Sequence, residues 1–340
     1  MGSHRRVAPS GLDRGAAAAL GVLSAAAAAL GAVPAPSAPA APLDDTRAEV
    51  DRLHTAAEQA TEAYNKAGER AGTLRRQVRD AQGRIARQQQ HVNTLREALG
   101  SLAGAQYREG GIDPAVALLL TSEPDDYLDK AAVLDRIGAR QAGELRTLRK
   151  ALRELAQERA EAARKVAELD RSRKAVAAHK KTVERKLAAA RRLLNSLSDD
   201  ERAAYDRASR TGRADLFGPG GDAPASGRAA AALAAARAAL GKPYVWGANG
   251  PAAFDCSGLT QWSYAQAGVA LPRTSQAQRY AGRQVPLSEA RPGDLVTYRS
   301  DASHIGMYAG NGQVIHAPRP GAPVRYDPVG MMPVSSVTRV

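Results

Sequence analysis

Apolar residues recur at alternating intervals of three and four positions along two long stretches of the chain, with charged and polar residues between them. Such heptad spacing predicts helices that pack along one seam. The pattern breaks at Gly110-Gly111 and a second seam follows, so we expect an antiparallel coiled-coil hairpin over residues 44–210. The first seam contains Val50, Leu53, Ala57, Ala60, Tyr64, Ala67, Ala71, Leu74, Val78, Ala81, Ile85, Val92, Leu95, Leu99 and Leu102. The second contains Leu145, Leu148, Leu152, Leu155, Ala162, Val166, Leu169, Val176, Val183, Leu187, Ala190, Leu194 and Leu197.

Charged residues interrupt the second seam. Arg159, Arg173 and Lys180 stand at core positions, which predicts either a weakened stretch or a fixed register. The many alanines in both seams predict a close approach of the helices with little apolar burial. Stability per residue should therefore be low.

The connection between the two seams carries an apolar segment of its own. Pro114 marks a helix start, because proline favours the first helical position. Val116, Leu118, Leu119 and Leu120 then make a short, strongly apolar helix. We expect this helix either to fold back onto the hairpin or to form a docking surface for another protein at the hairpin tip.

Residues 1–40 have the organisation of an export signal. Arg5 and Arg6 precede an uncharged run of small apolar residues, and Ala38-Pro39-Ala40 fits a signal-peptidase site. Cleavage is the expectation, and retention as a membrane anchor is the alternative. We therefore predict a secreted, cell-wall-associated protein whose single cysteine has no disulfide partner in the chain.

Composition separates a compact C-terminal domain from the rest of the chain. Aromatic residues make up 4% of the sequence, and nine of the 14 lie between Tyr244 and Tyr326. A stretch rich in glycine and proline predicts a linker over residues 211–227, and residues 228–340 form the candidate domain. The net charge is +13, but both signs are interspersed along the hairpin. We therefore predict no nucleic-acid binding, and only a weak attraction to anionic polymers such as a cell wall.

The single cysteine lies at a predicted helix start. Asp255 or Ser257 can cap the helix that continues through Leu259, which leaves Cys256 at its N-terminus. Free N–H groups and the helix dipole at that place stabilise a thiolate, the nucleophilic form of cysteine. Taken alone, the position is also compatible with a small core residue.

Two histidines supply the groups that such a nucleophile needs. His304 and His316 flank Gly310-Asn311-Gly312, and if these three residues form a hairpin loop, Ala309 pairs with Gln313. The histidines then lie diagonally on one face of the sheet, about 7–8 Å apart at the backbone. This is the arrangement of a general base and an orienting group, and it needs no cofactor. A metal site built from the cysteine, both histidines and a carboxylate is the alternative, although no H-x-x-E-H or C-x-x-C spacing is present.

Six short motifs follow one another through residues 228–340. They are Tyr244-x-Trp246-Gly247, Asp255-Cys256-Ser257-Gly258-Leu259, Pro272-Arg273-Thr274-Ser275, Pro292-Gly293-Asp294-Leu295, His304-Ile305-Gly306-Met307-Tyr308 and His316-Ala317. In kind and order they resemble the NlpC/P60 cysteine peptidases, and the hairpin with its export signal resembles the actinobacterial cell-wall endopeptidases of that family. The resemblance implies a papain-like α+β catalytic domain, with a nucleophile helix on an antiparallel sheet, preceded by the all-α hairpin. It also implies hydrolysis of peptidoglycan stem peptides between D-γ-glutamate and a diamino acid.

The resemblance implies roles for individual residues. Cys256 would be the nucleophile, His304 the general base that later protonates the leaving amine, and His316 the group that orients His304. The hydroxyl of Tyr244 would face the nucleophile and stabilise the oxyanion.

Four further residues are candidate substrate contacts on the same ground. Asp255 and Ser257 correspond to positions that line the pocket for the free amino end of a stem peptide, and both are also possible helix caps. Arg273 and Ser275 would meet a substrate carboxylate, for which the bidentate geometry of arginine is suited.

Other function classes remain open. An amidase or acyltransferase would use the same nucleophile on the same papain-like core. A non-catalytic wall-binding or signalling protein would use the hairpin as its working part. In an enzyme, we expect the hairpin either to occlude the active site or to dock on a membrane-embedded cell-division complex through residues 116–120. Occlusion predicts that an isolated fragment of residues 228–340 is at least several-fold more active than the mature protein.

Overall fold

The computed structural model describes residues 43–108, Val116, residues 124–208 and residues 223–340. The predicted export signal and residues 211–222 of the predicted linker lie outside these ranges. The apolar tip segment also lies outside them, apart from Val116, whose side chain is 47% exposed. No helix in the described part of the chain is long and apolar enough to cross a membrane.

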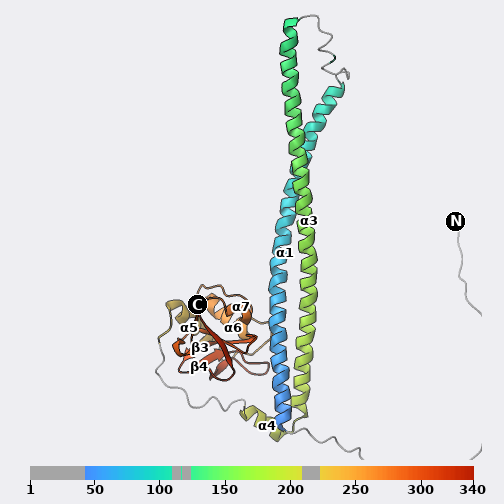
Figure 1. Cartoon of the computed structure of the whole chain (residues 1–340). Coiled ribbons are helices and arrows are strands. Elements are labelled where there is room, and N and C mark those ends of the chain that lie inside the picture. Colours follow the sequence, from blue (N-terminus) through green and yellow to red (C-terminus); the bar gives the residue numbers. More distant parts are fainter. Residues whose placement is uncertain (1–42, 109–115, 117–123, 209–222) are drawn as a thin grey trace, which may run out of the picture. The chain divides into compact units, whose positions relative to one another are not determined.

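Two long helices form the predicted hairpin. Helix α1 (Leu43–Arg108) and helix α3 (Pro124–Ser196) lie alongside each other (Figure 1). The seam residues of α1 are buried or half-buried, and in the contact Leu74 packs against Leu169 of α3 and a second cluster forms around Val92. The long all-α element predicted from the heptad pattern is therefore confirmed.

In the middle of α3, one of the two rows of predicted seam positions is buried and the other is exposed. Leu169 and Val183 are buried. The prediction that Arg159, Arg173 and Lys180 occupy core positions is wrong here, because long charged side chains keep their polar heads in water. Arg159 donates a hydrogen bond of 2.6 Å to Gln89 of α1 instead of entering the seam. The exposed row consists of Arg159, Val166 (50% exposed), Arg173 and Lys180.

A short helix follows the hairpin and contacts the C-terminal domain. Helix α4 (Asp199–Ala208) begins with a reciprocal cap, since Ser198 Oγ accepts a hydrogen bond from the Glu201 amide while the Glu201 carboxylate accepts one from the Ser198 amide. Near its other end, the ring of Tyr205 lies under the guanidinium of Arg319, 4.9 Å from it. This stacking links α4 to the C-terminal domain.

A six-stranded antiparallel sheet with the strand order β1-β6-β2-β3-β4-β5 forms the centre of the C-terminal domain. Helices α5 (Gly227–Ala238) and α6 (Cys256–Gln266) pack on each other and on β3, and the single turn α7 (Ser275–Gln278) follows α6. This is the α+β architecture expected from the motifs. The strands are β1 (Arg283–Val285), β2 (Leu295–Tyr298), β3 (His304–Gly310), β4 (Gln313–His316), β5 (Arg325–Pro328) and β6 (Val334–Arg339), with a 3₁₀ turn η1 (Leu287–Glu289) between β1 and β2.

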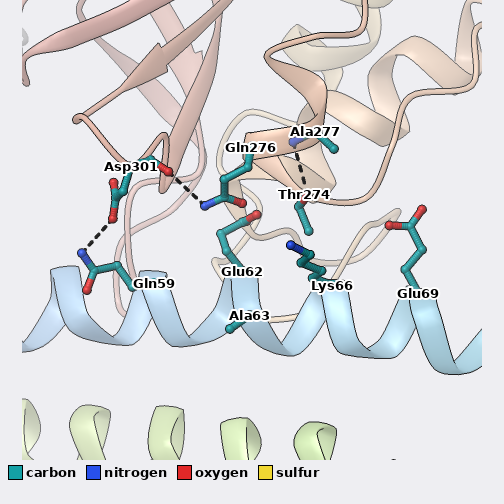
Figure 2. A pocket seen from close by; sticks show the side chains of 9 residues that line it. All are labelled: Gln59, Glu62, Ala63, Lys66, Glu69, Thr274, Gln276, Ala277 and Asp301. Carbon is teal, nitrogen blue, oxygen red and sulfur yellow. Dashed lines mark hydrogen bonds between the residues drawn. The ribbon is translucent and has the colours of Figure 1, made fainter. Parts of the chain in front are cut away.

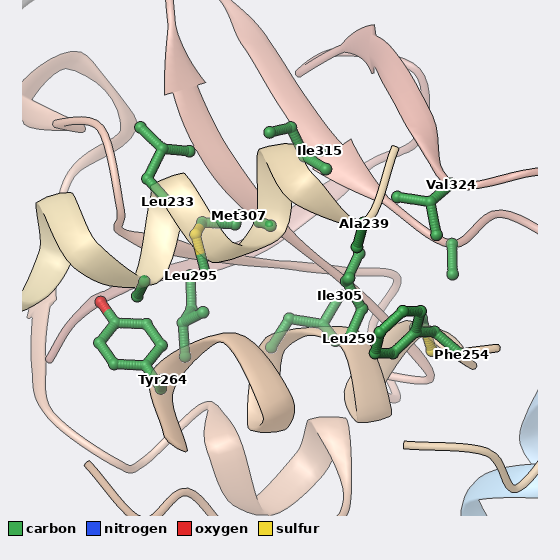
Figure 3. Packing of buried hydrophobic residues seen from close by; sticks show 14 of the residues in the cluster. Leu233, Ala239, Phe254, Leu259, Tyr264, Leu295, Ile305, Met307, Ile315 and Val324 are labelled. Carbon is green, nitrogen blue, oxygen red and sulfur yellow. The ribbon is translucent and has the colours of Figure 1, made fainter. Parts of the chain in front are cut away.

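The main core of this domain lies between the two helices and the sheet (Figure 3). Leu233 of α5 and Leu259 of α6 meet Ile305 and Met307 of β3, and all four side chains are almost fully buried. Alanines on the buried face of α5 let that helix approach closely. The packing holds α6, whose first residue is the candidate nucleophile, against β3, whose first residue is the first of the two histidines.

The β3–β4 hairpin has the predicted register but a tighter loop. Tyr308 pairs with Val314 as expected, whereas Gly310 rather than Ala309 pairs with Gln313, and Ala309 is the extra residue of a bulge. The turn then has two central residues, Asn311 and Gly312, both with positive φ, as a tight hairpin turn of this kind requires. Because the bulge lies beyond the register that aligns the histidines, it does not separate them.

Candidate active site

Cys256 is the first residue of α6. Asp255 caps the helix, and its Oδ1 accepts a hydrogen bond of 2.7 Å from the amide of Gly258. A Cβ at Gly258 would lie 2.2 Å from the carbonyl oxygen of Ala248, so only glycine lets the preceding loop cross this close to the first turn. The loop and the helix cap together hold the thiol in a buried position.

Three side chains from adjacent strands form a hydrogen-bonded line beside α6. Nε2 of His304 lies 2.8 Å from Nδ1 of His316, and Nε2 of His316 lies 2.8 Å from Oδ2 of Asp327 on β5. The two imidazole rings are nearly perpendicular, at 88°. The structure thus brings together the two histidines predicted from the sequence and adds a carboxylate that the sequence analysis does not identify.

Burial keeps the candidate nucleophile and base in their neutral forms here. It raises the pKa of the Cys256 thiol well above its ordinary value, and the carboxylates of Glu62 and Asp255 add to the rise. Burial, with His316 and Arg299 nearby, holds the pKa of His304 well below its ordinary value. The expectation that the helix N-terminus favours a thiolate is therefore wrong for this arrangement, because burial and nearby negative charge outweigh the helix dipole.

Asp255 has the capping role that was one of its two predicted roles, and it also binds Arg273. Besides capping α6, its carboxylate accepts two hydrogen bonds from the guanidinium of Arg273, at 2.6 and 3.0 Å, and one from the Gly247 amide at 2.9 Å. Arg273 also donates to Ser257 Oγ at 3.0 Å. Arg273 was predicted to meet a substrate carboxylate, but here it is bound to a carboxylate of its own domain.

The remaining predicted residues lie around this cluster. Tyr244 is buried, and burial together with the nearby charges of Cys256 and Asp255 raises the pKa of its phenol well above the ordinary value. Ser275 begins α7, and its hydroxyl donates a hydrogen bond of 2.6 Å to the carbonyl of Ala302. Its backbone amide donates a hydrogen bond to a carboxylate that lies outside this domain.

That carboxylate belongs to α1, the first helix of the hairpin. Glu62 Oε2 accepts a hydrogen bond of 2.8 Å from the Ser275 amide, and its Oε1 accepts one of 2.7 Å from Ser257 Oγ while lying 3.9 Å from the sulfur of Cys256. One turn further along α1, Asn65 donates to Asp255 at 3.1 Å. The helix therefore places a carboxylate against the candidate nucleophile.

A second carboxylate of α1 lies against the candidate base. Glu58 Oε1 is 3.6 Å from His304 Nδ1, and Glu58 is also paired with Arg299. Burial raises the pKa values of Glu58 and Glu62 to about 7, with Arg299 opposing the rise at Glu58 and Asp255 adding to it at Glu62. Tyr64, a predicted seam residue, packs edge-on against Trp246 with ring centroids 5.2 Å apart.

A cleft of about 570 Å³ lies beside these contacts, between α1 and the loops of the C-terminal domain (Figure 2). Glu62 and Lys66 line it from α1, and Thr274 and Gln276 line it from the start of α7. At its other edge, Gln59 donates a hydrogen bond of 2.8 Å to Asp301. Seven of its nine lining residues have polar or charged side chains, and the other two are alanines.

Sequence reasoning missed Asp327, Glu58, Glu62 and Asn65. The last three recur at helical intervals on α1 beside the seam, a pattern that is typical of a solvated face. Asp327 follows an irregular stretch with no periodicity to fix its register. Among the described residues, no group of three or more histidine, cysteine or acidic side chains is arranged to hold a metal ion.

Comparisons with known proteins agree with the geometry. The profile of the NlpC/P60 family matches residues 241–337. A probable endopeptidase of Corynebacterium glutamicum is 48% identical over 117 residues, which cover 34% of this chain and 56% of that protein. The matched stretch thus spans little more than half the length of this relative. The peptidoglycan hydrolase RipB from Mycobacterium tuberculosis is a solved structure with 34% identity, covering 33% of this chain and 64% of that one at a TM-score of 0.32.

Some relatives match along most of the chain. A probable endopeptidase of Mycobacterium bovis is 30% identical over 338 residues, which cover 85% of this chain and 88% of that protein. The match therefore includes sequence outside the catalytic domain. With its cysteine at the start of α6 and its paired histidines on β3 and β4, this chain belongs to the NlpC/P60 family of cysteine peptidases.

Proposed function

We propose that this chain is a secreted peptidoglycan endopeptidase that hydrolyses the amide bond between D-γ-glutamate and a diamino acid in stem peptides, in cell-wall remodelling or cell separation. The observation that carries the proposal is Cys256 at the N-terminus of α6 beside the hydrogen-bonded pair His304 and His316. A nucleophile, a base and an orienting group suffice for acyl transfer to water.

The chemistry follows from these positions. His304 accepts the thiol proton at Nδ1 as Cys256 sulfur attacks the amide carbonyl, and the backbone amides at the start of α6 and the phenol of Tyr244 stabilise the oxyanion. The C–N bond then breaks, and His304 returns the proton to the leaving amine. Water, deprotonated by the same imidazole, hydrolyses the thioester and releases the free carboxylate.

The cluster around Asp255 supports a specificity role in the same reaction. Asp255, Ser257 and Arg273 are held in one hydrogen-bonded group directly beside the nucleophile. The Asp255 carboxylate would pair with the free amino end of a stem peptide. The groups that bind Glu62, namely the Ser257 hydroxyl and the Ser275 amide, would be released to the substrate when α1 leaves.

The proposal includes occlusion of the site by α1. Glu62 lies 3.9 Å from the sulfur and Glu58 lies 3.6 Å from the imidazole, so α1 occupies positions beside both groups that a substrate would need. The same two carboxylates contribute to the raised pKa of the thiol. Docking of the hairpin tip on a membrane-embedded cell-division complex remains a separate proposal, and it would supply a means to withdraw α1.

Product analysis tests the function. The chain starting after residue 40 is incubated with purified peptidoglycan, and soluble products are identified by mass spectrometry, with Cys256→Ala as the control. The proposal expects each cut to add one water and to leave a new γ-carboxyl on glutamate and a new amine on the diamino acid. Release of intact stem peptides would instead identify an amidase, and products joined without added water would identify an acyltransferase. If neither the wild-type chain nor a variant that lacks the contacts of α1 with the site gave products, a lytic function would be contradicted.

A further inference from the structure

The carboxylate of Asp327 lies at the end of the histidine line, where no role has been assigned to it. Asp327 is on β5 and is 8% exposed, and it lies diagonally across from His316, whose direct partner in the register is Arg325. We propose that Asp327 is a positioning residue for the proposed hydrolysis: it fixes which nitrogen of each histidine carries a proton. The effect of Asp327 on hydrolysis rests on the proposed function, whereas its effect on the proton positions of the histidines does not.

Asp327 is held in its ionised form. Burial raises its pKa, but the hydrogen bond with His316 and the adjacent Arg325 outweigh burial, so the pKa lies below its ordinary value. Arg325 Nε donates to Oδ2 at 2.7 Å, and Oδ2 also lies 2.8 Å from His316 Nε2. An ionised carboxylate only accepts hydrogen bonds, so His316 must carry a proton on Nε2.

The proton positions of both histidines follow from this constraint. Burial lowers the pKa of His316 and Asp327 only partly offsets the effect, so the ring is neutral and its Nδ1 is an acceptor. His304 must then donate from Nε2 across the 2.8 Å contact. Its Nδ1 keeps a lone pair, and this buried atom makes no hydrogen bond among the described residues. Nδ1 is therefore the atom that can take the thiol proton.

Without the carboxylate, the opposite arrangement becomes available. His316 can carry its proton on Nδ1 and donate to His304 Nε2, which puts the His304 proton on Nδ1 and leaves that nitrogen no lone pair with which to act as a base. Asp327 also stabilises the positive charge that reaches the histidines when the thiol proton is taken. Both effects act through His316, and Asp327 itself does not touch the substrate.

The test compares four forms of the full chain: wild type, Asp327→Ala, Asp327→Asn and Asp294→Asn. Asp294 is a matched control, because it is also buried and paired with an arginine, Arg339, but has no hydrogen bond or ion pair with either histidine. Histidine side chains are labelled with ¹⁵N, and the protonated nitrogen of each ring is read by NMR, with assignments from His304→Ala and His316→Ala. Wild type and Asp294→Asn should show Nε2–H on both rings, and Asp327→Ala should show a mixture of tautomers.

Kinetics on stem peptides supply the second readout. We expect kcat of Asp327→Ala to fall by about tenfold or more, as for loss of a carboxylate that orients a catalytic histidine, with KM within about twofold. Asp327→Asn should lie between that variant and wild type. Wild-type tautomers in Asp327→Ala, or equal changes in Asp294→Asn, would overturn the inference. Because the tautomers are read without substrate, a chain inactive on peptidoglycan would contradict the proposed function while leaving this test intact.

Discussion

Glu62 accepts a hydrogen bond of 2.7 Å from the hydroxyl of Ser257, a residue 195 positions further along the chain and the direct neighbour of the candidate nucleophile. The contact joins the helical hairpin to the first turn of α6. The same carboxylate also binds the Ser275 amide, and under the proposed occlusion a substrate approaches Cys256 only after α1 has moved. The hairpin therefore lies where it can control the reaction.

Weakening this contact should raise activity. The double substitution Glu62→Ala and Asn65→Ala removes the hydrogen bonds of α1 to Ser257, Ser275 and Asp255. We expect cleavage of stem peptides by the full chain to rise about tenfold, since a shift of 1.4 kcal/mol in the closed–open equilibrium changes it tenfold. The rate of soluble product release measures the change.

A matched control is available on the same helix. Asn93 and Glu97 are exposed on α1, away from the catalytic domain, and replacing both by alanine makes the same two chemical changes. This control should leave the rate unchanged. A fragment beginning at residue 223, which contains both apolar cores of the domain and the Ser226 helix cap, should match or exceed the double variant. Equal rates for the fragment and the full chain would exclude occlusion.

The same carboxylate should make closure pH-dependent. Burial and the repulsion of Asp255 raise the pKa of Glu62 from 4.5 to about 7 when α1 is seated. The closed state therefore binds more protons than the open state between about pH 4.5 and 7, so closure weakens as pH rises through that range. Burial and Arg319 lower the pKa of His54 from 6.5 to about 4. Between these two values the closed state binds fewer protons at His54, so this group strengthens closure as pH rises.

The substitution Glu62→Gln isolates the contribution of this one group. Glutamine resembles the protonated carboxyl at all pH values, while the titration of His54 and of the catalytic groups is common to both forms. We expect equal rates near pH 4 and a progressively higher rate for wild type than for Glu62→Gln up to about pH 7, above which the ratio is constant. A rate ratio that is independent of pH would contradict the assigned titration.

Loss of the nucleophile should abolish the reaction. Cys256→Ala, made in the Glu62→Ala and Asn65→Ala background, should reduce hydrolysis by more than about a thousandfold, because no other group can form the acyl intermediate. His304→Ala should be comparable, while His316→Ala should retain a fraction. Thermal unfolding checks that each variant is folded. Residual cleavage by folded Cys256→Ala at the parental rate would exclude the cysteine mechanism.

The place of Cys256 at a helix start and the alignment of His304 with His316 can each be predicted from the sequence, because nearby residues determine them. A cap before Cys256 and a glycine-containing loop between His304 and His316 each fix geometry within about a dozen residues. The residues of α1 that reach the site could not be predicted in the same way: Glu58 and Glu62 are charged residues on a helix, and charged residues are rarely buried unless paired. Their partners, Arg299, Ser257 and Ser275, lie about 200 positions away, and only the tertiary structure brings them together.

The two rows of the α3 seam should differ in their contribution to stability. Val183 is fully buried and Val166 is 50% exposed, and both are replaced by alanine. Replacing valine by alanine stabilises the helix by about 0.5 kcal/mol through its higher helix propensity, and this gain is the same at both positions. Val183→Ala also loses two buried methyl groups, worth about 1.6 kcal/mol, so its free energy of unfolding should fall by about 1 kcal/mol. Val166→Ala should leave the free energy of unfolding unchanged or slightly raised. Urea unfolding followed by circular dichroism measures both values, and equal destabilisation by the two variants would show that the exposed row packs in solution as well.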